Sequence, residues 1–537
     1  MTSTWDYVIV GAGSAGCVVA HRLAALRGVR VLLLEAGGSE RRWDVVMPAG
    51  VMFAIGKPSL DWCYTTEPDP TLNGRKAPWG RGRVLGGSSS INGMIYVRGN
   101  RGDYDGWAHA GATGWSYDEV LPYFKRSEHN ENGASAYHGS GGPLHVSNLH
   151  PPHATTDLFI RAGMESGLPF NPDINGESQH GIGPIQATLR RGRRHSTASA
   201  FLRPAMATGR VTVIQHAQVT RVLFEGRRAV GVEYRQGEQT RQVRAGREVI
   251  LSGGAINSPQ LLMLSGIGPA AELQALGLPV LQDAPQVGRN LQEHVACSLT
   301  LEVKMRTLND ENGWGRRLLH GANWLLFGRG PAAASTAHAL AFIKTRPGET
   351  EPDVQVHFTP LGFNPAADSS REMLLDRPAI SMAANVSRPR SRSHLTLASA
   401  HPLERVRIHS RLLDDPDDVR RLTAACRHLR RMAATRVLGS QVVAEISPGP
   451  GVQTDDEWQA HLRQAAGHIY HPVGTCRMGS DDEAVLDPQL RVRGVHGLRV
   501  VDASVMPLIP SGNTNAPTIM VGEKGADLIL QDKDLHA

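Results

Sequence analysis

The chain has 537 residues, of which 41% are apolar and 20% are charged, the balance of a soluble globular protein. This composition excludes a collagen, a coiled coil, a disordered tail and a small disulfide-stabilised scaffold. The length is enough to bury a large core without disulfides or metals, and it predicts two large domains or three to four smaller ones.

The net charge of +6 at pH 7 raises the question of a nucleic-acid partner. Only seven of the 57 basic residues are lysines, and the arginines are spread along the chain. The one dense run of arginines, at 190–194, has no aromatic residues between them on which bases could stack. We therefore expect a solvated surface loop at this run and no nucleic-acid partner.

The cysteine and hydropathy patterns bear on the compartment of the protein. The five cysteines lie far apart and form no C-x-x-C pair, which indicates a reducing compartment and argues against a zinc site. The N-terminus lacks a basic segment followed by an apolar one, and the longest nearly apolar stretch, 45–56, is too short to cross a bilayer. We expect a cytoplasmic protein and leave peripheral attachment to a membrane open.

The first 35 residues predict a strand, a glycine turn, a helix and a second strand. Residues 5–10 are rich in β-branched and aromatic side chains, which favours a strand, and the sequence GAGSAG follows at 11–16. Residues 17–26 have helical character. Residues 29–34 are a continuous apolar run of the kind that lies buried in a parallel sheet.

The rest of the chain alternates between irregular and patterned segments. Residues 36–150 are rich in Gly, Pro, Trp and Asn with little periodicity, and we expect long loops there that wrap a ligand. A capping-box pattern at Thr454 predicts a helix that Gly467 would end. The other expected strands are 211–214, 219–224, 229–235, 249–252, 354–358 and 395–397, and the other expected helices are 256–264, 314–327 and 414–432.

The glycine turn carries a dinucleotide-binding fingerprint. Gly11, Gly13 and Gly16 form G-x-G-x-x-G between a predicted strand and a predicted helix, and Glu35 ends the next strand 19 residues after Gly16. Gly13 would let the backbone approach a pyrophosphate, and Glu35 would accept hydrogen bonds from a ribose. The fingerprint does not distinguish FAD from NAD. No second such motif occurs, so one tightly held dinucleotide with the substrate as electron donor is the simpler hypothesis.

Four further segments carry a resemblance to a known family. They are GRVLGGSSSINGMIYVRG at 82–99, GAINSPQLLMLSGIG at 254–268, HPVGTCRMG at 471–479 and GLRVVDASVMPLIPSGNTNAPTIMVGEK at 497–524. With the fingerprint, they resemble the glucose–methanol–choline (GMC) oxidoreductases over residues 5 to 530. Within the family, the sequence most resembles bacterial choline and alcohol dehydrogenases and hydroxymethylfurfural oxidases.

The resemblance implies an α/β fold of two discontinuous domains. A Rossmann-like FAD-binding domain would comprise 1–155, 195–300 and 465–537. A substrate-binding domain of 156–194 and 301–464 would carry a large antiparallel sheet backed by helices. The implied activity is FAD-dependent oxidation of a primary alcohol, whether aliphatic, aromatic or choline-like, to the aldehyde.

The resemblance also implies a catalytic pair. His471, in HPVGT, stands where the family has its catalytic base, and an imidazole suits removal of a hydroxyl proton while hydride leaves the carbon. Asn513 stands where relatives have His or Asn, and it can donate to an alkoxide but cannot act as a base. Asn515 is an alternative candidate for the role assigned to Asn513. Tyr470 and Phe358 are expected in the substrate pocket, and His357, Asn385 and Trp324 are further candidates for its walls.

The cofactor expected from the resemblance is FAD, bound without a covalent link. Some relatives attach FAD through a His just before the residue that matches Asn92, and here Ile91 stands in that place. Several histidines, His150, His153, His468 and His471, raise the question of a metal, but no acid or cysteine completes a set, and we expect none. The residues expected to bind the cofactor are Gly11, Gly13, Ser14, Ala15, Gly16, Glu35, Ala36, Gly86, Gly87, Ser88, Asn92, Gly93, Val219, Asp502, Ala503, Asn513 and Asn515.

The sequence leaves several alternatives open. Some proteins of this fold are lyases that cleave hydroxynitriles without net redox chemistry, and others are light-driven decarboxylases, so fold alone does not decide function. A serine hydrolase is disfavoured because no G-x-S-x-G occurs. Oxygen, a quinone or a cytochrome could accept the electrons. The protein is expected to be a monomer or a homodimer.

Overall fold

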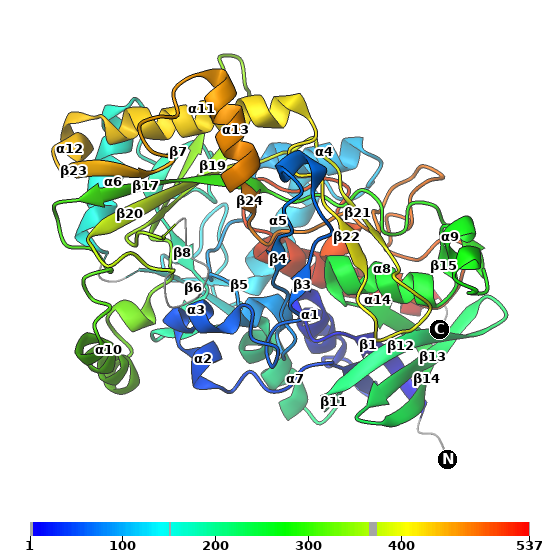
Figure 1. The fold of residues 1–537 in the computed structure, drawn as a ribbon. Coiled ribbons are helices and arrows are strands. Elements are labelled where there is room, and N and C mark those ends of the chain that lie inside the picture. The colour runs from blue at the N-terminus through cyan, green and yellow to red at the C-terminus, as the bar shows by residue number, and fades with distance from the viewer. Residues whose placement is uncertain (1–3, 150–151, 365–372, 536–537) are drawn as a thin grey trace.

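The computed structural model describes residues 4–149, 152–364 and 373–535. Figure 1 shows two regions side by side, one around strands β1, β12, β13 and β14 and the other around β17, β19 and β20. Each region is built on a sheet of seven described strands. One sheet is mainly parallel and the other is antiparallel, which confirms the predicted α/β class with a large antiparallel sheet.

The first sheet joins a parallel half to an antiparallel half through one long strand. Strand β14 (Gln239–Leu251) pairs antiparallel with β13 near its start, and it pairs parallel with β1 and β25 near its end. The order is β11 (Val211–Ile214), β2 (Val31–Leu34), β1 (Thr4–Val10), β14, β13 (Arg228–Gln236) and β12 (Ala217–Glu225), with β25 (Leu498–Val500) also beside β14. All four side chains of β2 are buried, as its continuous apolar sequence predicts.

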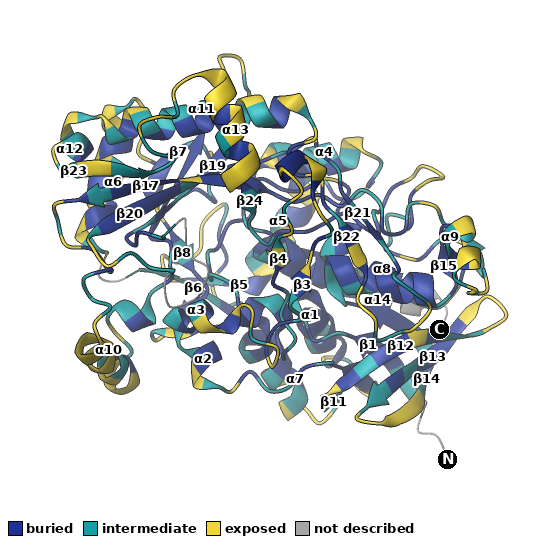
Figure 2. Ribbon diagram, in the orientation of Figure 1, coloured by how far each residue is buried: buried dark blue, intermediate teal, exposed yellow. Residues whose placement is uncertain are grey.

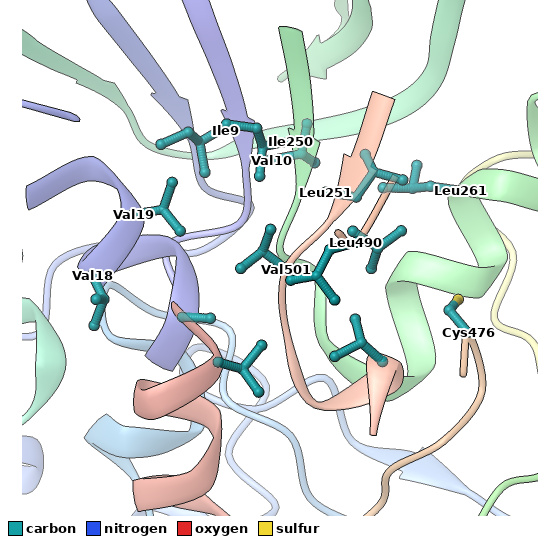
Figure 3. Close-up of a cluster of buried hydrophobic side chains, with 14 of the residues drawn as sticks. Ile9, Val10, Val18, Val19, Ile250, Leu251, Leu261, Cys476, Leu490 and Val501 are labelled. Carbon is teal, nitrogen blue, oxygen red and sulfur yellow. The ribbon is translucent and has the colours of Figure 1, made fainter. Parts of the chain in front are cut away.

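The core of this region lies between the sheet and two helices that are far apart in the sequence. Helix α1 (Ser14–Leu23) packs against α14 (Asn515–Leu535), where Gly522 comes so close to Ala15 that a Cβ on it would lie 3.0 Å from the Ala15 Cα. Burying each large apolar side chain stabilises the fold by about 1.5–3 kcal/mol. Figure 3 shows part of this core, with Ile9, Val10, Val18, Val19, Ile250, Leu251, Leu261, Cys476, Leu490 and Val501 labelled.

The second sheet is antiparallel throughout. Its order is β23 (Val442–Ser447), β17 (Val295–Val303), β20 (Ala379–Val386), β19 (Val354–Thr359), β18 (Ala339–Ile343) and β7 (Gly181–Pro184), with β24 (Gly467–His468) also beside β17. Helices α6 (Ala154–Glu165) and α11 (Pro416–Ala433) pack on one face. Strand β17 runs across the predicted domain boundary at residue 300, and that division of the chain stays a prediction.

Alternation along β19 gives this sheet two different faces. Val354, Val356 and Phe358 point into the apolar core under α6 and α11, where Phe358 stacks on Phe159 with ring centroids 4.6 Å apart. Gln355 and His357 therefore point to the opposite face. The polar side chains of β19 are thus directed away from the helices.

The expectation of long loops over 36–150 is only partly right. Helix α4 (Arg101–His109) begins with a capping box at Asn100, and α5 (Tyr117–Ser127) begins with one at Ser116. Two glycines in α4 and Pro122 in α5 are residues that rarely occur inside helices, so they weaken the helical pattern of the sequence. The capping boxes are the local signals that identify these helices. The segment from residue 80 to 100 is irregular, apart from a single 3₁₀ turn over Gly87–Ser90.

The arginine run is also only partly a solvated loop. It forms the hairpin of β9 (Leu189–Arg190) and β10 (Arg193–Arg194), in which Arg190, Arg191 and Arg193 are exposed. Arg194 is buried, because the alternation of a strand turns it to the opposite side from Arg193.

The predicted helix at 314–327 is α10 (Trp314–Phe327), and the capping box at Thr454 begins α13 (Asp455–Ala465).

All five cysteines are free thiols, and no helix among the described residues is long and apolar enough to cross a membrane. The remaining elements are α2 (Trp43–Val46), α3 (Val51–Ala54), α7 (Arg203–Ala207), α8 (Gly254–Leu264), α9 (Ala270–Ala275), α12 (Arg436–Gly439), β3 (Tyr64–Thr65), β4 (Pro78–Trp79), β5 (Glu128–Asn130), β6 (Leu144–Asn148), β8 (Gln186–Ala187), β15 (Ile267–Gly268), β16 (Gln282–Asp283), β21 (His394–Thr396), β22 (Arg407–His409), the π-helical turn η4 (Ala198–Leu202) and the 3₁₀ turns η1 (Pro48–Gly50), η2 (Pro70–Leu72), η3 (Gly87–Ser90), η5 (Pro331–Ala333) and η6 (Ala503–Val505).

Candidate active site

A cavity of about 620 Å³ runs from the end of β1 to the polar face of β19. At one end it is lined by the glycine turn after β1, by Glu35 after β2 and by Val219 on β12. At the other end it is lined by His357, His471 and Asn513. The cavity therefore connects the carboxyl edge of the parallel sheet, where α/β folds bind ligands, with the antiparallel sheet.

Glycines let the backbone form one wall of this cavity. Gly11 has φ +102°, and a Cβ there would lie 2.5 Å from the carbonyl oxygen of Ser252. Gly87 has φ +52°, and a Cβ there would lie 2.7 Å from the Cα of Gly13, so the loop at 86–88 rests directly on the glycine turn. A side chain at Gly11 or Gly87 would collide with this backbone and push the packed segments apart, so glycine at both positions keeps the shape of the wall.

Two predicted cofactor residues, Gly16 and Gly86, do not line the cavity and act behind it. A Cβ on Gly16 would lie 2.0 Å from the Gly11 carbonyl oxygen, so this glycine permits α1 to approach the turn. Gly86 has φ +89°, and its N–H donates to the Ala12 carbonyl at 2.7 Å. Both residues shape the wall without facing a ligand.

Three helices begin at the cavity. The N-termini of α1 and α14 lie together, because the Ser14 Oγ donates to the Asn515 Oδ1 at 2.7 Å, and α8 begins nearby at Gly254. A helix N-terminus carries a partial positive charge and unpaired N–H groups. This end of the cavity therefore fits a diphosphate group, which the fingerprint predicts.

Glu35 is buried at the edge of this end. Its carboxylate accepts the Ala12 N–H at 2.8 Å and the Gly37 N–H at 2.7 Å, and burial raises its pKa to about 7. The side chain holds the glycine turn against the end of β2 and also lines the cavity. This is the geometry that a ribose-binding acid requires.

The Asp502 carboxylate is fully engaged by the protein. One oxygen accepts from the Gly254 N–H at 2.8 Å and the Ser258 Oγ at 2.6 Å, and the other accepts from the N–H and Oγ of Ser504. The side chain therefore fixes the loop that presents Asp502 and Ala503 to the cavity.

The loop from Ser88 to Gly93 forms another wall, with Ile91 and Asn92 facing the cavity. The Asn92 Oδ1 accepts from Nη1 of Arg194 at 2.8 Å, and the same nitrogen donates to the Asn92 carbonyl at 2.6 Å. Burial lowers the pKa of Arg194 to about 9, and among the described residues it has no carboxylate partner. Sequence reasoning missed Arg194, because nothing local distinguishes it from the exposed arginines beside it.

His471 and Asn513 meet at the opposite end of the cavity. The Asn513 Nδ2 lies 3.1 Å from the His471 Nε2, and Gln355 Nε2 donates to the Asn513 Oδ1 at 3.2 Å. The Gln355 bond fixes the amide of Asn513 with its NH₂ toward His471. Asn515, the rival candidate, lies instead at the start of α14 beside Ser14.

A second histidine determines which nitrogen of His471 carries the proton. His294 Nε2 lies 2.9 Å from the Ser387 carbonyl oxygen, which can only accept, so this nitrogen carries the hydrogen and Nδ1 does not. The His294 Nδ1 lies 3.0 Å from the His471 Nδ1, which must therefore be the donor. His471 Nε2 is therefore an acceptor, and it accepts from the Asn513 NH₂ group beside the cavity.

Burial keeps this pair of histidines neutral. Burial, reinforced by the neighbouring His294, lowers the pKa of His471 well below 6.5, and burial lowers the pKa of His294 to about 4. Glu293 accepts the backbone N–H of His471 at 2.6 Å and that of His294 at 3.0 Å, so one side chain holds both backbones. Neutral imidazoles with defined tautomers are what proton removal requires.

The pocket walls differ in part from the expectation. Tyr470 lines the cavity with φ +70°, a strained backbone that presents its carbonyl to the Arg81 Nη2 at 2.7 Å. Phe358 is in the apolar core of the second sheet, because the alternation of β19 turns its neighbour His357 to the cavity. Asn385 and Trp324 are buried and do not line the cavity either.

Sequence reasoning did not identify three side chains around His471 and Asn513, namely Glu293, His294 and Gln355. They lie 158 to 178 residues before their hydrogen-bond partners in the sequence, and no local motif marks them. His150, one of the histidines considered for a metal, lies outside the described residues.

The site was compared with known proteins. Sequence models of the GMC oxidoreductases match residues 5–296 and 389–522. The chain is 42% identical to mouse mitochondrial choline dehydrogenase, over 99% of this chain and 91% of that protein. It is 41% identical to the alcohol dehydrogenase (acceptor) of Pseudomonas putida, over 99% of this chain and 96% of that protein.

Solved structures agree with these matches. Pyridoxine 4-oxidase from Mesorbium loti superposes with a TM-score of 0.89 at 30% identity, over 98% of this chain and 99% of that one. A variant of formate oxidase from Aspergillus oryzae superposes with a TM-score of 0.92 at 26% identity, over all of both chains. The likeness thus extends over both sheets and the cavity.

Proposed function

This chain belongs to the GMC oxidoreductase family, and we propose that it oxidises a primary alcohol to its aldehyde with His471 as the base. It is an FAD-dependent enzyme that acts on CH–OH donors. The proposal assigns separate roles in this reaction to His471 and Asn513. Aliphatic, aromatic and choline-like alcohols are all candidates for the substrate.

The observation that carries the proposal is the lone pair on His471 Nε2. The chain of bonds from the Ser387 carbonyl through His294 leaves that nitrogen as an acceptor, at the cavity end lined by the pair. A hydroxyl group placed there would donate its proton to Nε2. Nδ1–H stays bonded to His294, so the imidazolium that forms shares its charge with a neutral neighbour.

Asn513 supplies the complementary donor. Its NH₂ lies 3.1 Å from the base and is held by Gln355, so a substrate oxygen bound beside His471 would accept from it. As the proton leaves, charge develops on that oxygen, and a fixed donor stabilises it more than the neutral hydroxyl. Asn513 therefore favours the alkoxide while His471 removes the proton.

The glycine turn, the three helix N-termini and Glu35 would hold the dinucleotide, and the loop at 88–93 would hold its ring system. When bound, FAD supplies the acceptor for the hydride that leaves the alcohol carbon. Ile91 lines this part of the cavity and has no nucleophilic atom, which supports non-covalent binding. Acid denaturation of the purified protein should release unmodified FAD, and a flavin that stays on the polypeptide would contradict this.

The test of function is anaerobic mixing of the holoenzyme with a panel of aliphatic, aromatic and choline-like alcohols. A substrate should bleach the flavin band at about 450 nm, because the flavin takes up two electrons. A hydroxynitrile that is cleaved while the flavin stays oxidised, with no alcohol bleaching it, would favour the lyase. Re-oxidation by oxygen, a quinone or a cytochrome would then identify the acceptor.

The place of the protein in the cell is a separate proposal. We propose the cytoplasm, and a monomer or homodimer, as the sequence predicts. The relatives reported above include a mitochondrial protein and a bacterial one, so they do not decide between compartments.

A further inference from the structure

Helix α10 presents its apolar side to solvent. Six of the thirteen most exposed large apolar side chains among the described residues lie on this helix. Trp314 is 79% exposed and Leu326 is 70% exposed. Figure 2 shows α10 as largely exposed, at the periphery of the molecule near α2 and α3. The six are Trp314, Leu318, Leu319, Leu325, Leu326 and Phe327.

The exposed residues form a continuous face. At 100° per residue, Trp314, Leu318 and Leu325 fall within one narrow stripe, and Leu319 and Leu326 extend it along the same side. No charged residue lies within this arc, because Arg316 and Arg317 fall about 60° beyond its two edges, and Phe327 also lies outside it. A surface helix normally turns such a face to the core, so an outward apolar face of this size indicates an interaction surface.

The helix is firmly attached through its other side. Trp324 is buried, and its indole Nε1 donates to the Gly192 carbonyl at 2.8 Å. Arg193 lies over the Trp324 ring, 5.3 Å from its centroid. The outward orientation of the leucines therefore follows from specific contacts with the β9–β10 hairpin, and rotating the helix to bury them would break those contacts.

Arginines surround the apolar face. Six exposed arginines lie on α10, directly after it, or on the β9–β10 hairpin that packs against it. Among the described residues, only Arg316 of this group forms an ion pair, with Glu311 at 2.5 Å. An apolar face with a basic border is complementary to an anionic lipid surface. The six are Arg190, Arg191, Arg193, Arg316, Arg317 and Arg329.

The apolar face is close to the mouth of the cavity. The turn η5, which follows α10, packs against η1, and η1 leads directly into α3. Helix α3 exposes Phe53, and the residue after the helix, Ile55, is both partly exposed and part of the cavity lining. A surface that covers α10 therefore also borders the route to the active site.

We propose that α10 and its arginine border bind the surface of an anionic lipid bilayer. The helix has 14 residues and is about 21 Å long at 1.5 Å per residue, too short to span a bilayer, so it would lie in the interface. A two-fold contact with a second copy is disfavoured, because it would place the arginine border of one copy near that of the other. The proposal goes beyond alcohol oxidation and does not depend on it.

The experiment is flotation of the FAD-loaded full chain with two kinds of vesicle, phosphatidylcholine alone and phosphatidylcholine with ~30% phosphatidylglycerol, a strongly anionic surface. The wild type should float with the anionic vesicles at low salt, and much less with the neutral ones. Leu318→Gln/Leu325→Gln should lower the partition coefficient at least ~10-fold, since two leucines leave the interface. Arg190→Gln/Arg191→Gln should lower it ~5-fold per arginine, and only with the anionic vesicles.

The matched control is Met164→Gln/Val443→Gln, which removes two exposed apolar side chains from other elements and should leave binding unchanged. All variants should retain their flavin and its rate of reduction by substrate, which separates lost binding from misfolding. Failure of the wild type to float, or equal flotation of the leucine variant, would overturn the proposal. The proposal would also be overturned if the leucine substitutions dissociated an oligomer of the protein and left vesicle binding unchanged, because the face would then be a contact between protein chains.

Discussion

The two ends of the cavity differ in how far the protein itself satisfies the hydrogen bonds of their buried polar groups. At the dinucleotide end the Asp502 carboxylate is satisfied by the protein itself, through the four hydrogen bonds that it accepts. At the reacting end, Gln355 Oε1 and His357 Nε2 are buried without a partner among the described residues. An unpaired buried polar group costs about 1–3 kcal/mol. The Asp502 carboxylate is therefore fully hydrogen-bonded before any ligand binds, whereas the reacting end has buried polar atoms with which a ligand could form hydrogen bonds.

This contrast predicts that changes at the two ends have different effects. Substitutions at the reacting end should slow flavin reduction without loosening FAD, and substitutions at the dinucleotide end should do the reverse. Each prediction below tests one side of this separation.

The largest expected effect is that of His471→Ala. Loss of the base should slow anaerobic flavin reduction by ~10²–10⁴-fold in stopped-flow measurements, the usual span for a general base. FAD content should stay near that of the wild type, because none of the contacts at the dinucleotide end involves His471. His409→Ala, in the β21–β22 hairpin, is the matched control and should reduce at the normal rate. Normal reduction in His471→Ala would show that the site is misplaced.

Asn513→Ala should slow flavin reduction by ~10–10³-fold, less than loss of the base, because it removes a donor and leaves the proton acceptor. Asn513→His keeps a ring N–H and should recover part of the rate. The measurement is the limiting rate of reduction at saturating substrate. If Asn513→Ala proved more damaging than His471→Ala, the roles assigned to the two residues would be wrong.

At the other end, Glu35→Ala should raise the dissociation constant of FAD by ~10–10²-fold, the cost of losing charged hydrogen bonds. Turnover per bound flavin should change by less than ~2-fold, because the carboxylate would contact the ribose and not the reacting carbon. Titration of the apoprotein with FAD, followed by assay at full occupancy, checks both. Glu233→Ala, which breaks an ion pair with Arg221 outside the cavity, should leave both unchanged.

The dependence of kcat/KM on pH tests the state of the base. Burial lowers the pKa of His471 below its ordinary value of 6.5, so the neutral form should dominate at and above that pH. The rate should be flat above 6.5 and fall about tenfold per pH unit below the lowered pKa, as the imidazole gains a proton. A decline that begins above pH 7 would show that burial does not depress this group, or that another group is the base.

The smallest expected effect is that of Gln355→Leu, which removes the donor that orients Asn513. The rate of flavin reduction should fall by only ~2–10-fold, about the value of one neutral hydrogen bond. In an Asn513→Ala background the same substitution should have no further effect, because Gln355 is a positioning residue that acts through Asn513. Additive losses would show an independent role for Gln355.

The two ends also differ in how far the sequence reveals them. The dinucleotide end depends on backbone shape, so its determinants appear as contiguous signals, such as Gly11 to Gly16 and the acid that ends β2. Ile91 and Asn92 follow from a second contiguous motif. Gly16 and Gly86 belong to these motifs and still do not face the ligand, because close packing and ligand contact both select glycine.

The reacting end is assembled from side chains on separate segments. His471 and Asn513 were predicted because motifs surround them, whereas His294 and Gln355 reach the site only through the pairing of β17, β20 and β19. The alternation along β19 places Phe358 and His357 on opposite faces of the sheet, but the sequence does not reveal which of the two faces lines the cavity. The tertiary arrangement of the second sheet was therefore needed to complete the site.

The bond between Ser14 and Asn515 joins residues that are 501 positions apart in the sequence. At a synthesis rate of ~5–20 residues per second, the ribosome needs on the order of tens of seconds to make the chain between them. Throughout that time the glycine turn lacks the helix that completes its diphosphate-binding end. The nascent chain therefore cannot load its cofactor as it emerges, and a protein truncated before α14 should leave the ribosome colourless.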